Sequence, residues 1–433
     1  MAGWTRRLLP AVLILSISIA AVLVYGQAYP VISPYDEMSH LDALHQALHF
    51  DVVRRGERVG VDAIEEAACA GAEIDNSGLP PCPRPGQPVS PIPPVFTNAD
   101  LHPPSYYLLT AQFARVFLLF GADTVLQAGR IVGGLWLGMG LLLFWIAAQA
   151  LRIGWLPRVI LMALIGSAPI VMHASSIVNP DASSLVAGAA VLLAGLRWEQ
   201  GRWPVAVLIG VALLAGLFRS TNALAIGGVA VYLVLRAMAE REGSDRTRAQ
   251  YLSTAAALVA AGALSVLGWA VVREVLAVSE VAPTVEFFRD EPFGIGELLG
   301  QASALLSPLR AGEIAGPISG SGAAGSLIMG VLNALVLAAC FGPLMFRRSL
   351  SPRNALGIAG AVAMLSAGSV LAAANLLVFG VFFPIPVRYG LSLVPLVGLA
   401  LAARLRRSPA IYLAGTLALA SVAYAATSLL LGA

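Results

Sequence analysis

The sequence predicts an all-α membrane protein with about eleven transmembrane helices, and three observations support this prediction. Of its 433 residues, 58% are hydrophobic and 12% are charged, roughly half the charged share of a soluble domain. Apolar runs recur along the whole chain. The 27 basic residues are all arginine, and most of them lie in alternate connections between these runs. We therefore treat residues 1–433 as a single integral-membrane domain.

The first apolar run, residues 8–28, is expected to be an uncleaved transmembrane helix. Its apolar core is longer than that of a usual signal peptide, and it lacks a convincing A-x-A cleavage site. About 20 apolar residues suffice to cross a hydrocarbon core about 30 Å thick. The further runs lie near residues 128–150, 159–175, 183–197, 204–218, 223–238, 251–272, 325–346, 355–379, 389–404 and 410–430.

The orientation depends on residues 103–121. This stretch is barely long enough to span, and Arg115 in its middle would cost about 2.5–3.5 kcal/mol at the bilayer centre. If it does not cross, the main arginine clusters share one side, which the positive-inside rule makes cytoplasmic. We therefore expect an amphipathic helix on the outer surface. The N-terminus is then inside, and residues 29–127 and about 273–324 are external.

The external loop opens with "SPYDEMSHLDALHQALHF", residues 33–50. A second surface helix, beginning near Pro34, places Asp36, Glu37 and His40 in one angular sector. A partly desolvated carboxylate at this membrane exit has a pKa suited to a general base. The alternative is an interfacial helix with a solvated polar face.

The same loop holds two candidate pairs. His45 and His49 are spaced i, i+4 and form a candidate metal pair, although the sequence identifies no further ligand. Cys69 and Cys82 can form a disulfide if the loop faces an oxidising compartment. The alternative for the cysteines is two unpaired small residues.

The segment "TNADLHPPSYYLL", residues 97–109, concentrates further polar and aromatic side chains. His102 precedes two prolines that favour an extended entry into the surface helix. Tyr106 and Tyr107 suit the headgroup zone, where amphipathic rings lie. An aromatic belt with an incidental histidine explains this segment equally well.

Three external turns carry charged residues. Asp181 lies in "SSIVNPDASS" and can simply cap the next helix. Arg219 in "FRSTN" and Arg388 in "PVRYG" lie at outer ends, where the positive-inside rule does not favour them. Because the planar guanidinium group binds phosphate well, both suggest an anionic lipid headgroup. The alternative is snorkelling to native phospholipid.

Five motifs in order resemble the GT-C superfamily of integral-membrane glycosyltransferases: "PYDEMSH", "LHPPSYYLL", "GRIVGGLWLGMG", "GSAPIVMHASSIVNPDAS" and "VRYGLSLVPL". The resemblance is nearest to a poorly characterised bacterial branch with a P-x-D-E-x-x-H opening, and it covers most of the chain. The chain departs from the family in having no large C-terminal soluble domain. The resemblance implies a GT-C-like fold in the bacterial inner membrane. Its active site would face the periplasm or cell exterior and serve cell-wall biosynthesis.

The resemblance also implies the chemistry. A sugar passes from a polyprenyl-phosphate donor to the hydroxyl of a glycan or lipid-linked acceptor, with inversion. Asp36 or Glu37 is the general base, Asp181 is the second acidic residue, and Arg388 receives the leaving phosphate. The remaining candidate substrate contacts are His40, His102, Tyr106, Tyr107, Arg219 and Tyr389. Residues 273–324, rich in Gly and Ser near their end, would form a mobile flap.

Other functions remain open. A divalent metal near Asp36, Glu37 and His40 is one alternative, which would also suit a membrane hydrolase. A transporter or flippase for a lipid-linked saccharide would need ionisable residues along a transmembrane path, whereas the runs here are apolar. A non-catalytic scaffold is a further alternative. The expected partners are the donor, the acceptor and membrane lipids; the cytoplasmic connections lack a nucleotide-binding Gly-rich motif, and no nucleic acid is expected.

Overall fold

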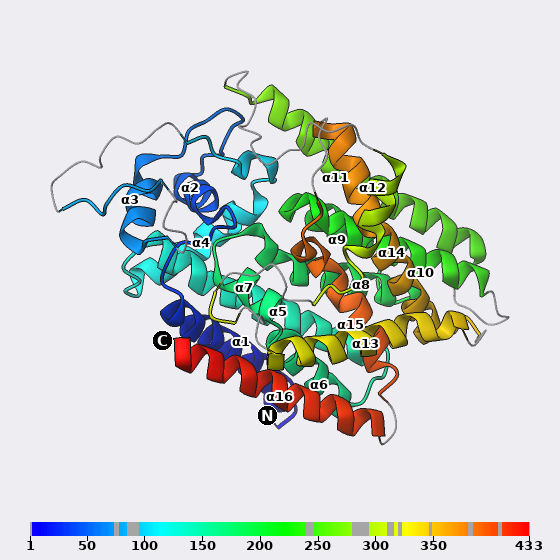
Figure 1. The fold of residues 1–433 in the computed structure, drawn as a ribbon. Coiled ribbons are helices and arrows are strands. Elements are labelled where there is room, and N and C mark those ends of the chain that lie inside the picture. The colour runs from blue at the N-terminus through cyan, green and yellow to red at the C-terminus, as the bar shows by residue number, and fades with distance from the viewer. Residues whose placement is uncertain are drawn as a thin grey trace.

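The computed structural model describes residues 2–72, 78–84, 95–239, 246–278, 294–309, 316–318, 323–345, 349–379, 384–405 and 409–432. The secondary-structure elements of these described residues are helices, and there are no strands among them (Figure 1). The helices before the first long bundle helix are α1 (Ala2–Ala28), α2 (Glu37–Leu48), α3 (Val61–Ala70), η1 (Ala99–Leu101) and α4 (Ser105–Leu119). The helices of the middle are α5 (Val125–Ala150), α6 (Trp155–Gly166), α7 (Pro169–Ser176), η2 (Pro180–Ser183), α8 (Ser184–Glu199), α9 (Val205–Phe218), η3 (Ser220–Asn222), α10 (Ala223–Met238) and α11 (Arg248–Val275). The last are α12 (Ile295–Gly300), η4 (Gln301–Ser303), α13 (Ala323–Met345), α14 (Pro352–Phe379), η5 (Val387–Leu393), α15 (Val394–Ala402) and α16 (Pro409–Gly432).

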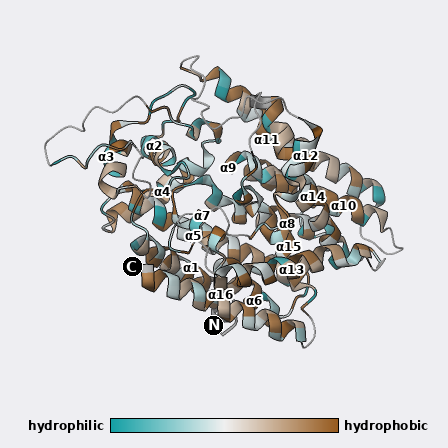
Figure 2. Ribbon diagram, in the orientation of Figure 1, coloured by the Kyte–Doolittle hydropathy of each residue, from teal (hydrophilic) through white to brown (hydrophobic). Residues whose placement is uncertain are grey.

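The predicted all-α, multi-pass membrane class is confirmed. Seven helices of the described chain are long and apolar enough to span, namely α1, α5, α10 with η3, α11, α13, α14 and α16. Helices α6 and α7 meet at 63° and make an eighth span if they are counted as one. Figure 2 shows these bundle helices largely in the hydrophobic colour.

We predicted about eleven transmembrane helices. Judged by helix length and composition, the described residues contain seven or eight candidate spans. The other predicted runs fold as α8, α9 and α15, which are shorter. Each of these helices borders a 3-10 turn with polar residues, which are η2, η3 and η5. A 14-residue helix such as α9 is only about 21 Å long at 1.5 Å per residue. The turns therefore lie within the bundle, where they can form a site.

The arginine-bearing connections meet at one end of the bundle. Arg236 donates from Nε to Glu199 Oε1 at 2.6 Å and from NH1 to the Leu350 carbonyl at 2.8 Å. Arg353 donates to the Leu151 carbonyl at 3.3 Å. This clustering agrees with the predicted alternation of the connections. We call the opposite end, which carries α2, α3 and α4, the site end.

The predicted surface helix is α4, which packs against α2 and α5 and is not a candidate span among the described residues. It runs beside α5 rather than only across the surface, because Trp136 donates from Nε1 to Thr110 Oγ1 at 3.1 Å. Trp136 lies eleven residues after Val125, about 16 Å along the α5 axis. The α4 helix therefore accompanies the first three turns of α5.

The cysteines of the loop form the disulfide that was one of the two alternatives. Cys69 in the last turn of α3 is bonded to Cys82. Cys340 in α13 is buried and unpaired. The disulfide ties the chain that follows α3 back to this helix.

Candidate functional site

Four charged residues meet at the site end, each from a different segment. Asp36 precedes α2, Asp181 lies in η2, Arg219 precedes η3 and Arg388 lies in η5. The structure thus brings together four of the predicted site residues that lie up to 352 positions apart (388 − 36).

The four charges form a buried half and an accessible half. Arg388 Nε lies 3.3 Å from Asp181 Oδ2, and Arg388 NH2 lies 4.0 Å from Asp36 Oδ2. The guanidinium of Arg219 contacts the other oxygen of Asp181. The side chains of Asp181 and Arg219 are 1% and 2% exposed, whereas those of Asp36 and Arg388 are 45% and 22% exposed. Asp181 therefore holds both arginines, and only Asp36 and Arg388 are open to another molecule.

Two tyrosine rings support the guanidinium groups. The Arg388 Cζ lies 4.8 Å from the ring centroid of Tyr35 and 5.6 Å from that of Tyr389. Arg219 Cζ lies 4.8 Å from the Tyr389 centroid. These cation–π contacts restrict the planes of both arginines. Tyr389, a predicted substrate contact, therefore packs between the two arginines. Tyr35 was not predicted to be a site residue.

Asp36 is held in an uncommon backbone conformation. Its φ of 62° is left-handed, which Asp tolerates better than most residues do. Its side chain makes no capping hydrogen bond to α2, and its Oδ1 instead accepts from Asn98 Nδ2 at 2.7 Å. The carboxylate thus points away from the helix that it precedes.

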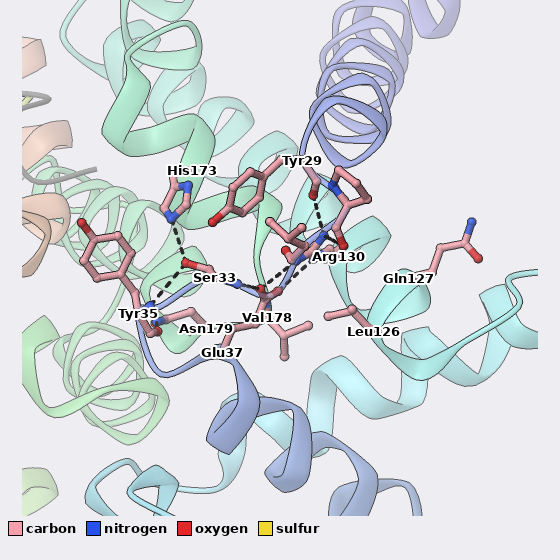
Figure 3. A network of polar contacts seen from close by, with 12 residues as sticks. Tyr29, Ser33, Tyr35, Glu37, Leu126, Gln127, Arg130, His173, Val178 and Asn179 are labelled. Atoms are coloured by element: carbon pink, nitrogen blue, oxygen red, sulfur yellow. Dashed lines mark hydrogen bonds and ion pairs between the residues drawn. The ribbon is translucent and has the colours of Figure 1, made fainter. Parts of the chain in front are cut away.

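Glu37 lies next to Asp36 in the chain but in the opposite environment. Figure 3 shows its carboxylate among Ser33, Arg130 and Val178. Its side chain is 0% exposed. Its oxygens accept from the backbone N–H groups of Ser33 at 2.8 Å and Val178 at 2.9 Å. They also accept from Arg130 Nε at 2.9 Å and NH2 at 2.7 Å. Four donors therefore surround this carboxylate.

Arg130 of α5 extends the same network, and the sequence reading did not single it out. It also donates to the carbonyls of Tyr29 at 2.8 Å and Val31 at 2.7 Å. Together Glu37 and Arg130 connect α1's exit, α2, α5 and the segment after α7. The sequence could have indicated Arg130, because it is an arginine in the first turns of a span, where a charge needs a partner.

His40 and Tyr107, which are buried, and His102, which is half-buried, form a group beside the charged residues. His40 Nδ1 and Tyr107 Oη are 2.7 Å apart, and the ring centroids of His40 and His102 are 5.4 Å apart. Burial lowers the pKa of both histidines well below the usual value, and the positive charge of Arg219 acts in the same direction. Both imidazoles are therefore neutral at pH 7.

Tyr106 has a different place from Tyr107. Its ring is buried, 5.2 Å from the Tyr107 ring and 5.7 Å from that of Trp136 by centroids. It belongs to the apolar core between α4 and α5. A role in substrate contact stays a prediction for this residue.

A cavity adjoins the accessible charges. It is small, partly open to solvent, and lined by Tyr35, Ile170, His173, Ala174, Ile177, Asp181 and Arg388. Three of the lining residues, Ile170, Ala174 and Ile177, are spaced i, i+4, i+7 along α7 and its end. The cavity thus has one apolar wall and one charged wall.

His173 is a cavity residue that the sequence reading missed. Its Nδ1 is 2.7 Å from the Tyr25 hydroxyl, and its Nε2 is 3.2 Å from Ser33 Oγ. Figure 3 shows the ring directed toward Ser33, from the side opposite Arg130. The sequence could have indicated His173, because it is a lone histidine in an apolar run.

A metal centre stays a prediction. The described residues contain no group of three or more His, Cys, Asp or Glu side chains placed to hold a metal ion. His45 Nε2 lies 2.7 Å from Glu66 Oε2, and His49 is the exposed residue that ends α2. Near Asp36, the oxygens of Glu37 already have four protein donors.

Part of the predicted flap packs against the segment that carries Arg388. Gln301 Oε1 accepts from the backbone N–H of Ile385 at 3.0 Å. A Cβ added to Gly390 would lie 3.3 Å from Leu305 and 3.4 Å from Pro308. Residues 279–293, 310–315 and 319–322 of the predicted flap lie outside the described residues.

A scan against protein-family models, a search of curated proteins and a search of solved structures found no match to this chain. The geometry above is therefore the basis for assigning a function. It offers an accessible carboxylate, an accessible guanidinium and a cavity that is apolar on one side.

Proposed function

We propose that this chain is a GT-C-type glycosyltransferase that moves a sugar from a polyprenyl-phosphate donor to an acceptor hydroxyl. The observation that carries the proposal is the position of Arg388 between Asp36 and Asp181, beside the cavity walled by α7. A lipid-linked phosphate requires a cation next to an apolar surface. An acceptor hydroxyl requires a base within reach of the same place.

Asp36 is the better candidate for the base, which the sequence left open between Asp36 and Glu37. Its carboxylate is 45% exposed and accepts one strong hydrogen bond, from Asn98. Glu37 is fully buried and has four donors. We therefore assign Glu37 and Arg130 the role of positioning Asp36 and the segment that leads to Asp181.

The reaction then proceeds in one displacement. Asp36 takes the proton from the acceptor hydroxyl as its oxygen bonds to the anomeric carbon. The bond from that carbon to the phosphate oxygen breaks, and its electron pair leaves with the prenyl phosphate. Arg388 neutralises this leaving group, and Asp181 with Arg219 holds Arg388 in place. Attack from the opposite face of the sugar inverts the anomeric centre.

The cellular setting is part of the same proposal. The positive-inside rule assigns the arginine-bearing end to the cytoplasm, so the site end faces the periplasm or cell exterior of a bacterial inner membrane. A prenyl chain held in the bilayer would reach the cavity along the apolar wall formed by Ile170, Ala174 and Ile177. The acceptor would approach from the aqueous side of Asp36.

The test is transfer by the purified full-length protein in nanodiscs. A panel of prenyl-phosphate hexoses and pentoses is the donor probe, a mixture of glycans and lipid-linked saccharides supplies the acceptor hydroxyl, and release of free prenyl phosphate is followed by mass spectrometry. We expect release with at least one donor, and its loss in Asp36→Asn. Movement of these donors across vesicles without bond cleavage would instead indicate a transporter or flippase and would overturn the proposal.

A further inference from the structure

The α4 helix exposes only apolar side chains. Its exposed residues and the residue that ends it are Leu109 (36%), Phe113 (39%), Val116 (44%), Leu119 (86%) and Phe120 (85%). Four of them follow the spacing i, i+4, i+7, i+11, which forms one stripe along a helix. The polar residues Gln112 and Arg115 are half-buried.

Phe50 adds a further exposed ring. It has a φ of 60°, a left-handed conformation that is an outlier for a bulky residue, and it is 67% exposed. Arg115 Cζ lies 4.5 Å from the ring centroid, and Arg115 also donates to the Leu48 carbonyl. The backbone and Arg115 therefore hold this ring in an outward position. Such a conformation persists only where its surroundings enforce it.

We propose that Phe50 and the exposed face of α4 form a lipid anchor, inserted into the leaflet at the site end. The anchor is continuous with a membrane span, because a five-residue link (120–124) joins α4 to α5. The contact of Thr110 with Trp136 places α4 beside the α5 turns that enter the bundle. The proposal goes beyond the glycosyltransferase function and does not depend on it.

Acyl chains fit this surface better than a protein partner does. Docking patches for proteins usually have an apolar centre with a polar rim. The exposed residues of α4 have no polar member. Six large exposed apolar side chains in the α2–α4 region would be unfavourable in water. In a bilayer they would contact lipid, as would Leu23 and Val24 of the candidate span α1, which are 41% and 43% exposed.

The anchor has a structural consequence for the site. Helix α2 packs against α4 and begins directly after Asp36. A membrane-inserted α4 would therefore keep the carboxylate at the level of the lipid headgroups. The described parts of 29–124, which are 29–72, 78–84 and 95–124, would act as a lipid-bound cap of the bundle and not as a free extracellular loop.

Nitroxide labels on single cysteines in the full-length protein test the anchor. The background variant is Cys340→Ala with the native disulfide kept, reconstituted in phosphatidylethanolamine–phosphatidylglycerol vesicles. The probes are Phe50→Cys and Phe120→Cys; Val24→Cys is the lipid reference and Asp62→Cys, on an exposed position of α3, is the aqueous reference. Collision rates with oxygen report lipid, and those with a nickel chelate report water.

We expect the oxygen-to-nickel ratio at 50 and 120 to match that at 24 and to exceed that at 62. A ratio equal to that at 62 means free exposure to water and overturns the proposal. Low rates with both reagents mean that protein covers the face and also overturn it. If a labelled variant fails to fold, Phe50→Trp replaces it, with added fluorescence quenching by brominated lipids as the expected result. No added quenching would reject the anchor.

Discussion

Replacing Asp36 and Glu37 one at a time tests the two different roles that we propose for these adjoining carboxylates. Glu37→Gln should lower stability, and activity should fall with it. Asp36→Asn should leave stability almost unchanged and remove the base. The two changes are chemically identical in kind, so the difference between them comes only from their surroundings.

The expected magnitude for Glu37→Gln follows from its burial. The change removes the charge opposite Arg130, whose side chain is 7% exposed, and turns an amide N–H₂ toward two of the four donors. Breaking a buried ion pair by removing one partner costs about 3–5 kcal/mol. A matched control is Glu274→Gln, because Glu274 pairs with Arg55 while 53% exposed. A surface pair of this kind contributes at most about 1 kcal/mol.

The expected magnitude for Asp36→Asn is kinetic. Asn tolerates the left-handed conformation at least as well as Asp, and its Oδ1 can still accept from Asn98. Stability should therefore stay within about 0.5 kcal/mol, as for other surface substitutions. Loss of a general base should reduce the transfer rate about 10²–10⁴-fold.

The assay is the thermal unfolding midpoint in detergent together with prenyl-phosphate release in nanodiscs. Arg130→Gln and the double variant with Glu37→Gln complete a cycle, in which the double variant should lose less than the sum of the singles. An unfolding midpoint for Glu37→Gln no lower than that of Glu274→Gln would refute the structural role. Release that survives Asp36→Asn at the original rate would refute the assignment of the base.

Three further predictions concern other parts of the molecule. Arg388→Ala should raise the donor KM as well as lower kcat, because Arg388 would contact phosphate in both ground and transition states; a change in kcat alone would contradict this role. Because burial lowers the pKa of His40 and His102, only the unfolded chain binds protons as the pH falls below about 6.5. Stability should then fall by up to about 1.4 kcal/mol per pH unit for each imidazole, and thermal unfolding midpoints that stay level from pH 7.5 to 5.5 would exclude this. Reducing Cys69–Cys82 should cost about 3 kcal/mol for a loop with a separation of 13, measured as a lower unfolding midpoint with dithiothreitol than without.

The all-α membrane class could be read from the sequence because it depends on local properties. Twenty consecutive apolar residues favour the bilayer whatever their neighbours are. The disulfide was left between two alternatives, since cysteine spacing restricts a pairing without proving it. The number of full spans stays a prediction, because an apolar run does not reveal where the chain bends or shortens. The break between α6 and α7 and the short α8, α9 and α15 follow from polar turns packed inside the bundle.

The sequence also identified most of the charged residues that meet at the site. Asp36, Asp181, Arg219 and Arg388 were noticed because charges at the ends of apolar helices need an explanation. Arg130 and His173 were missed, because each lies within an apolar run whose sequence is explained by helix packing alone. Their partners are 93 and 140 positions away in the chain.

What the sequence determined by itself is therefore the membrane class and the set of polar residues at the ends of its helices. Only the tertiary structure decided what each of these residues can do. Asp36 and Glu37 are adjacent in the chain, yet one carboxylate is 45% exposed and the other is 0% exposed. The physical reason is that burial and charge pairing depend on segments distant in sequence, here α5 and the turn after α7. No local pattern in residues 33–50 contains that information.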